Sequence, residues 1–293
     1  MNPGDRPHPV KAYKNPDFLS SDAARPIRIL AELTEPAERL RAAGVENTLI
    51  FFGSARIQRP ELTQQRLSHA EAAAARAPDD PAAQRELNIA RRLAESAEYY
   101  GQSRELARIL AEWTRQRPAD ATPYHLCTGG GLGLMEAVNR GAADAGVRSI
   151  GLGMSLPFEE TANSYVPADL AFEFHYFMMR KYWFATKARA MIVLPGGFGT
   201  LDEFFEMANL HVCQKLKNAI PTVLYGSRFW KSILNFDALA EFGVIDETDL
   251  DFLTLADTPV EARDWLIERL EPGDASSADD ATPPPTAHPS PES

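Results

Sequence analysis

The sequence has few cysteines and no long apolar run. Cys127 and Cys213 are its two cysteines among 293 residues, and their spacing matches neither a CxxC redox pair nor a zinc-binding pattern. This indicates reduced thiols in a cytoplasmic protein without a metal site. No window approaches about 18 consecutive apolar residues, and the first residues lack the apolar segment of a signal peptide. We therefore expect no membrane partner.

Positive charge is also scarce. The chain has 30 Lys and Arg against 41 Asp and Glu, a formal net charge of -11 at pH 7. Proteins that bind nucleic acid usually carry a basic face, so we expect no nucleic-acid partner.

Two motifs, one typical of nucleotide-binding proteins and one typical of hydrolases, are missing as well. Without GxxxxGK[ST] there is no P-loop, and without GxSxG a serine nucleophile has no support.

Apolar strand patterns alternate with helical patterns over most of the chain. Between residues 27 and 271 this alternation predicts a single α/β domain, a Rossmann-like doubly wound parallel sheet with helices on both faces. The polar arm 1–26 and the Pro-rich, acidic tail 272–293 are predicted to be disordered. Residues 61–117 are predicted to add a helical insert of two helices, separated at Asp79-Asp80-Pro81, with a long second helix.

Three glycine clusters each follow a predicted strand, and parallel strands end at one edge of a sheet, so the clusters should converge. Glycine lets backbone N–H groups approach an anion, and the helix that follows adds its dipole, worth about 0.3–1 kcal/mol. Tight turns and helix caps are the alternative reading, but three clusters together favour phosphate binding. The candidate residues are Gly53 and Ser54; Gly129, Gly130 and Gly131; and Pro195, Gly196, Gly197, Phe198, Gly199 and Thr200.

The second cluster also narrows the class of ligand. It is not GxGxxG, because Leu134 stands at the third glycine position counted from Gly129, and Glu136 stands there counted from Gly131. A dinucleotide is therefore disfavoured. A mononucleotide or a sugar phosphate remains.

Charged residues lie beside these loops. Thr200 and Glu203 have the spacing of a capping box, yet the same placement lets Glu203 reach a sugar attached to the phosphate. Asp202, about 100° away around the helix, is expected to point elsewhere. Arg180 and Lys181 occupy a helix start, where the dipole disfavours a cation. An anionic ligand or a surface salt bridge would account for them.

Aromatic and sulfur-containing residues surround that basic pair. His175 is predicted to be a hydrogen-bonded core histidine rather than a general base. The segment 176–184 is predicted to belong to the core or to a subunit interface, in preference to a base-stacking platform. Its relevant members are Met178, Met179, Tyr182, Trp183 and Phe184.

Four segments together resemble a known family. "PGGFGTLDE" (195–203), "MRK" (179–181), "GSAR" (53–56) and "CTGGGLGLMEAVNRGA" (127–142) are similar to the signatures of the LOG (Lonely Guy) proteins, cytokinin riboside 5′-monophosphate phosphoribohydrolases often labelled lysine decarboxylases. The resemblance runs from about Thr48 to Trp230. Because the insert, arm and tail exceed the compact members, the chain resembles a longer bacterial type.

The resemblance implies hydrolysis of the N-glycosidic bond of a nucleoside 5′-monophosphate, AMP or a cytokinin riboside monophosphate, to free base and ribose 5-phosphate. Arg180 and Glu203 would be the catalytic pair, and Met135 and Lys181 would join the glycine loops in binding substrate. A carboxylate there would stabilise oxocarbenium character on the ribose. No cofactor is implied, and a homodimer or larger homo-oligomer is. Ala55 departs from compact members, which usually have a second serine there.

Other functions remain open on the residues alone. A nucleotide-binding or carrier protein on the same fold would bind without turnover. A scaffold acting through the insert 61–117 is a further alternative. Decarboxylation has no support, because Lys181, Lys187 and Lys215 lie in predicted helices without a recognisable pyridoxal-phosphate context. Which base is preferred is not encoded in the spacing.

Overall fold

A parallel sheet forms the centre of the protein, whose structure is a computed structural model that describes residues 9–155, 162–216 and 220–271. The seven-stranded sheet has the order β4-β3-β2-β1-β5-β6-β7, and every neighbouring pair is parallel. The strands are β1 (Asn47–Phe52), β2 (Tyr124–Thr128), β3 (Ile150–Met154), β4 (Ala171–Phe174), β5 (Ala188–Val193), β6 (Thr222–Tyr225) and β7 (Leu253–Ala256). The expected Rossmann-like parallel sheet is confirmed.

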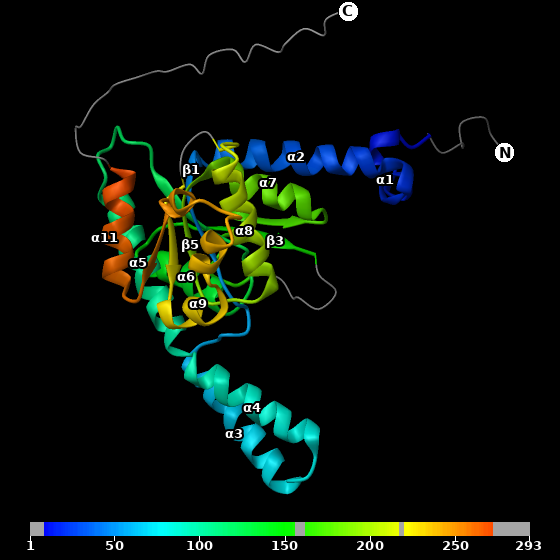
Figure 1. Cartoon of the computed structure of the whole chain (residues 1–293). Coiled ribbons are helices and arrows are strands. Elements are labelled where there is room, and N and C mark those ends of the chain that lie inside the picture. Colours follow the sequence, from blue (N-terminus) through cyan, green and yellow to red (C-terminus); the bar gives the residue numbers. More distant parts are fainter. Residues whose placement is uncertain (1–8, 156–161, 217–219, 272–293) are drawn as a thin grey trace, which may run out of the picture.

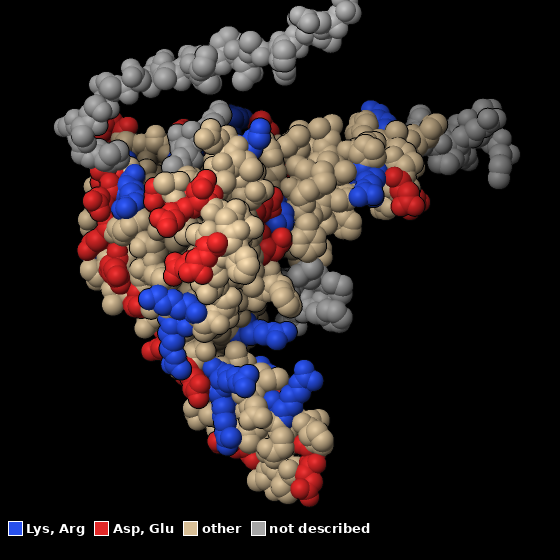
Figure 2. Space-filling view, in the orientation of Figure 1, with Lys and Arg blue, Asp and Glu red and all other residues tan. Residues whose placement is uncertain are grey.

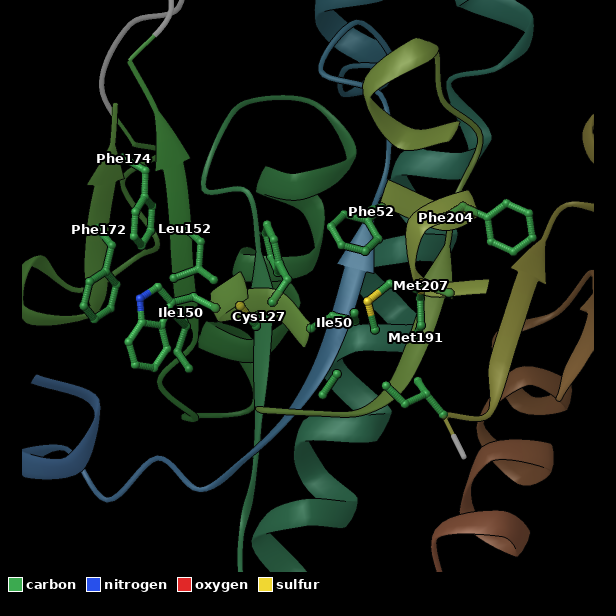
Figure 3. Packing of buried hydrophobic residues seen from close by; sticks show 14 of the residues in the cluster. Ile50, Phe52, Cys127, Ile150, Leu152, Phe172, Phe174, Met191, Phe204 and Met207 are labelled. Atoms are coloured by element: carbon green, nitrogen blue, oxygen red, sulfur yellow. The ribbon is translucent and has the colours of Figure 1, made fainter. Parts of the chain in front are cut away.

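Helices cover both faces of this sheet (Figure 1). Successive side chains of a strand point to opposite faces, so Ile50 and Phe52 join one core cluster while Leu49 and Phe51 join the other. Figure 3 shows the first cluster, in which Phe204 and Met207 pack beside strand residues. The first face is covered by α2 (Arg25–Ala42), α7 (Phe177–Lys187), α8 (Phe198–Val212) and α9 (Ser227–Ile233), and the second by α5 (Glu98–Gln116), α6 (Leu134–Asp144) and α11 (Pro259–Leu270).

The strand order reverses at β1. From β1 the chain adds β2, β3 and β4 on one side, and then returns to place β5 against the other side of β1. Ligands of open α/β sheets bind outside the carboxyl ends of the strands at such a reversal. The loops after β1 and β5 flank this point, and the loop after β2 is their neighbour.

The segment 61–117 contains three helices rather than the predicted two. The expected break separates α3 (Pro60–Arg76) from α4 (Pro81–Glu95), where the Asp80 side chain caps α4. A second break at Ser96–Ala97 divides the predicted long helix into α4 and α5. Alanine-rich and leucine-rich patterns continue across that break, so composition alone did not reveal it. Helix α5 is part of the domain built around the sheet, because its buried residues pack in the core on the second face.

The hairpin of α3 and α4 projects from the rest of the molecule at the edge where the strands end (Figure 1). Its own small core consists of Ala70, Ala74, Leu87 and Ala90. Figure 2 shows Lys and Arg side chains gathered where the hairpin meets the body. A groove of ≈ 430 Å³ along the hairpin is lined by residues that include Arg56, Arg66 and His69.

The remaining elements are short. Within the arm, the described residues include α1 (Pro16–Ser20), capped by Asn15, while the tail 272–293 lies outside the described residues. After α9 ends at Ile233, α10 (Phe236–Glu241) begins where the Asn235 side chain accepts a hydrogen bond from the Ala238 amide. None of the helices described here has the length and apolar character needed to cross a membrane.

Candidate functional site

Backbone hydrogen bonds join the three glycine loops. The Ser54 amide donates to the Pro195 carbonyl at 3.0 Å, and the Leu134 amide donates to the Ser54 carbonyl at 3.0 Å. The loop after β1 therefore links the loops after β2 and β5. The structure brings the three loops together, as the alternation of strands and helices predicted.

Close packing against the backbone requires glycine at one position of the loop after β2, Gly133. Gly133 has φ +67, and a Cβ there would lie 2.5 Å from the Ser54 carbonyl oxygen, so a side chain is excluded both by conformation and by space. A Cβ on Gly129 would meet the Met135 Sδ at 2.8 Å, which places the Met135 side chain against this loop. By contrast, a Cβ on Gly197 or Gly199 would meet open space.

Helix α8 begins earlier than the capping-box reading predicted. Its first residue is Phe198 and its N-cap is Gly197, which makes no side-chain cap, so Thr200 and Glu203 both lie inside the helix. The capping box is wrong, because the helix starts directly on the glycine loop. Its first-turn amides therefore have no side-chain cap, and such helix starts attract anions. Phe198 is 92% exposed beside them.

Glu203 forms an ion pair with Arg180. The Arg180 Nη2 lies 3.0 Å from the Glu203 Oε1, and the two side chains are 16% and 4% exposed. The Arg180 Nε is buried and has no hydrogen-bond partner among the described residues. Helices α7 and α8 thus bring together the two residues expected to be the catalytic pair, although their roles stay a prediction.

Lys181 lies among three carboxylates. Its Nζ is 2.9 Å from the Asp202 Oδ2 and 3.8 Å from the Glu203 Oε2, and it also pairs with Glu206. Asp202 was expected to point elsewhere, but Lys181 reaches across to it. Lys181 therefore does form salt bridges, but its side chain is only 16% exposed, whereas the alternative to an anionic ligand placed it at the surface. Its predicted contact with substrate remains a prediction.

The acid–base properties of this cluster follow from burial. Burial raises the pKa of Glu203 above the usual glutamate value, while the charge and hydrogen bond of Arg180 and the charge of Lys181 oppose that rise. For Lys181, burial disfavours the charge, yet hydrogen bonds to Glu206 and Asp202 hold its pKa above the usual lysine value. Perturbed groups of this kind concentrate at functional sites.

The expectations for His175 and for the segment 176–184 have different outcomes. His175 is exposed rather than buried, since β4 ends at Phe174 and its own position lies at the sheet edge. In α7, Met179, Trp183 and Phe184 are buried in the core. Phe177, Met178 and Tyr182 are exposed. The helix therefore has one core face and one apolar face turned outward.

Three site residues were missed from the sequence. Asp202 and Glu206 share α8 with Glu203, and Glu206 follows it at helical spacing, which was a usable signal. Asn163 donates hydrogen bonds to the Gly130 and Gly131 carbonyls. It lies in a loop without glycine or strand pattern, so its sequence context held no signal. No group of three or more His, Cys, Asp and Glu within residues 9–155, 162–216 and 220–271 is arranged to hold a metal ion.

Comparison with known proteins agrees with the motifs. A family model described as "Possible lysine decarboxylase" matches residues 135–266. The cytokinin riboside 5′-monophosphate phosphoribohydrolase LOG3 of Arabidopsis thaliana is 31% identical over 149 residues, 49% of this chain and 64% of that protein. The chain is similar in sequence to this LOG protein. The alignment with this LOG protein covers just under two thirds of the relative's length.

Two solved structures match this chain at low similarity. An X-ray structure of a structural genomics target is 20% identical, with a TM-score of 0.42, and covers 74% of this chain and 96% of that one. A structure titled as a Moco carrier protein from Chlamydomonas reinhardtii is 22% identical, with a TM-score of 0.37, and covers 58% and 88%. Both similarities are too weak to inform function, so the function of the candidate site is inferred from the residues of this chain.

Proposed function

We propose that this protein hydrolyses the N-glycosidic bond of a nucleoside 5′-monophosphate, AMP or a cytokinin riboside monophosphate, and releases the base and ribose 5-phosphate. The single observation that carries the proposal is the buried Arg180–Glu203 pair at the end of the sheet where the three glycine loops meet. Relatedness to proteins named for this reaction supports it.

The reaction makes a specific demand on Glu203. As the bond between C1′ and the base nitrogen breaks, its electron pair leaves with the base, which takes up a proton, and positive charge develops on the ribose. Water then forms the new bond to C1′ and loses a proton. An ionised Glu203 stabilises the positive ribose and orients or deprotonates that water. Its burial strengthens this electrostatic effect, because little solvent screens it.

Arg180 and the glycine loops prepare the site for this step. The Arg180 guanidinium holds the Glu203 carboxylate in its ionised form and fixes its position. The same guanidinium would hold the phosphate or the charge of the departing base. The uncapped start of α8 would bind the 5′-phosphate, and this remote binding energy would place C1′ beside the carboxylate.

A substrate panel tests the proposal. We expect the protein to release free base from one or more nucleoside 5′-monophosphates, with AMP and an N6-prenylated AMP as the first pair. The matching nucleosides should react far more slowly, because they lack the phosphate that the loops bind. Thermal stabilisation by AMP without any release of base would instead identify a nucleotide-binding protein.

We also propose that the chain forms a homodimer or larger homo-oligomer. Met178 and Tyr182 are 59% and 46% exposed, and their spacing places them on the same outward face of α7. Large apolar side chains grouped on a surface commonly mark contacts between proteins. The same helix carries Arg180, so an interface here would lie near the candidate site.

A further inference from the structure

A buried polar network lies directly beneath the glycine loop 129–131. The Asn163 Nδ2 lies 3.0 Å from the Gly130 carbonyl oxygen, 2.9 Å from the Gly131 carbonyl oxygen and 2.9 Å from the Asn139 Oδ1. This nitrogen carries two hydrogens and shares them among the three acceptors. The Asn163 backbone amide donates to the Gly130 carbonyl as well, at 2.8 Å. One residue thus holds two consecutive carbonyl groups of the loop.

Further hydrogen bonds extend the network from Asn139 into the core. Asn139 accepts from the Thr128 hydroxyl at 2.8 Å and donates to the Ser149 hydroxyl at 2.9 Å. The Thr128 oxygen in turn accepts from the Gly130 amide at 2.9 Å. Thr128, Asn139, Ser149 and Asn163 are all nearly or fully buried. Networks in which every member is satisfied rigidify their surroundings, whereas removal of one member leaves a costly unpaired group.

The geometry of the peptide bond determines where the N–H groups of this loop point. In a planar trans peptide the C=O of one residue and the N–H of the next point to opposite sides. Because the Gly130 and Gly131 carbonyls point inward to Asn163, the amides of Gly131 and Leu132 must point away from the buried network. Neither amide has a hydrogen-bond partner among the residues that the structure describes. Successive outward N–H groups form an anion-binding concavity.

We infer that the amides of Gly131 and Leu132 bind a phosphate oxygen of the nucleotide, and that Asn163 is the positioning residue that holds them ready. Leu132 is 46% exposed, so this part of the loop lies at the surface of the protein. The inference rests on the proposed nucleotide substrate. It adds two donors from the loop after β2 to those at the start of α8.

Asn163→Ala tests the positioning role, with Ser149→Ala as the matched control. Both changes leave Asn139 short of one partner within the same buried network, but only Asn163 touches the loop. Hydrogen–deuterium exchange should become faster at Gly131 and Leu132 in Asn163→Ala and not in Ser149→Ala. If Asn163→Ala does not fold, the gentler Asn163→Ser takes its place. Equal exchange in both variants would overturn the positioning role.

Binding of AMP tests the phosphate contact. Measured in a Glu203→Gln background to prevent turnover, AMP affinity should fall about 5- to 30-fold on Asn163→Ala, the effect of one or two ordinary hydrogen bonds, and stay within about twofold on Ser149→Ala. Unchanged affinity in Asn163→Ala would overturn the inference even if the wild-type protein releases adenine. Weakened affinity in a protein that never releases adenine would uphold the inference and refute the proposed hydrolysis. Absence of any AMP binding would refute the phosphate contact.

Discussion

At the scale of single residues, the function depends on one carboxylate kept in an unusual environment. Glu203 is buried, and its charge is maintained by Arg180 on one side and Lys181 on the other. Removal of one partner from a buried ion pair is costly because the other charge is left uncompensated. The activity of the protein is therefore expected to depend strongly on substitution of either residue and on pH.

The pH dependence of activity should report this environment. Burial raises the pKa of Glu203, so hydrolysis, which needs the carboxylate ionised, should decline on acidification at a higher pH than an ordinary glutamate would give. The Lys181 charge lowers that pKa, so Lys181→Met should move the acidic limb of kcat/KM to still higher pH. Lys187→Met is the control. An acidic limb that stays in place in Lys181→Met would contradict the assignment of the limb to Glu203.

The glycine loop offers a second test at this scale. Gly133→Ala should lower the stability of the protein by about 1–3 kcal/mol, because φ is positive and the Cβ would overlap the Ser54 carbonyl. Gly199→Ala places its methyl group in open space and should change stability by less than about 0.5 kcal/mol. Thermal unfolding of the two variants makes the comparison. Similar melting temperatures would show that the loops after β1 and β2 are not packed together as described.

At the scale of elements, sequence patterns predicted the sheet well and the details of its helices less well. Alternating apolar runs identified the strands, and glycines after them identified the convergent loops. The start of α8 was misplaced, because Thr200 and Glu203 satisfy the capping-box pattern while Gly197 occupies the true N-cap. The contact of Asn163 with the glycine loop could not be predicted, since tertiary packing alone brings the two together. Among the partners of Lys181, only Glu206 had a usable signal, its helical spacing from Glu203.

The hairpin should unfold independently of the sheet. Leu87 belongs to its small separate core, whereas Leu110 is fully buried in the core beneath the sheet. Leu110→Ala should lower the free energy of global unfolding by about 2–5 kcal/mol. Leu87→Ala should leave it nearly unchanged and accelerate hydrogen exchange only within α3 and α4. Global destabilisation by both substitutions would show that hairpin and sheet form one cooperative unit.

At the scale of the whole molecule, the proposed oligomer can be tested through α7. Met178→Glu combined with Tyr182→Glu should convert a dimer or larger assembly to a monomer in sedimentation velocity experiments, because two charges would be buried at the interface. Leu239→Glu, on the surface of α10, is a control at another exposed apolar position. A wild-type chain that sediments as a monomer at micromolar concentration would refute the proposal.

The most direct test of the central claim is the release of adenine from AMP by two matched variants. Glu203→Gln removes the buried carboxylate, and Asp202→Asn removes its neighbour, whose side chain is 57% exposed. We expect Glu203→Gln to lose about 10²- to 10⁴-fold in kcat, the usual effect of a positioned acid–base group, and Asp202→Asn to keep most of its activity. Adenine release by Glu203→Gln at the wild-type rate would contradict the account.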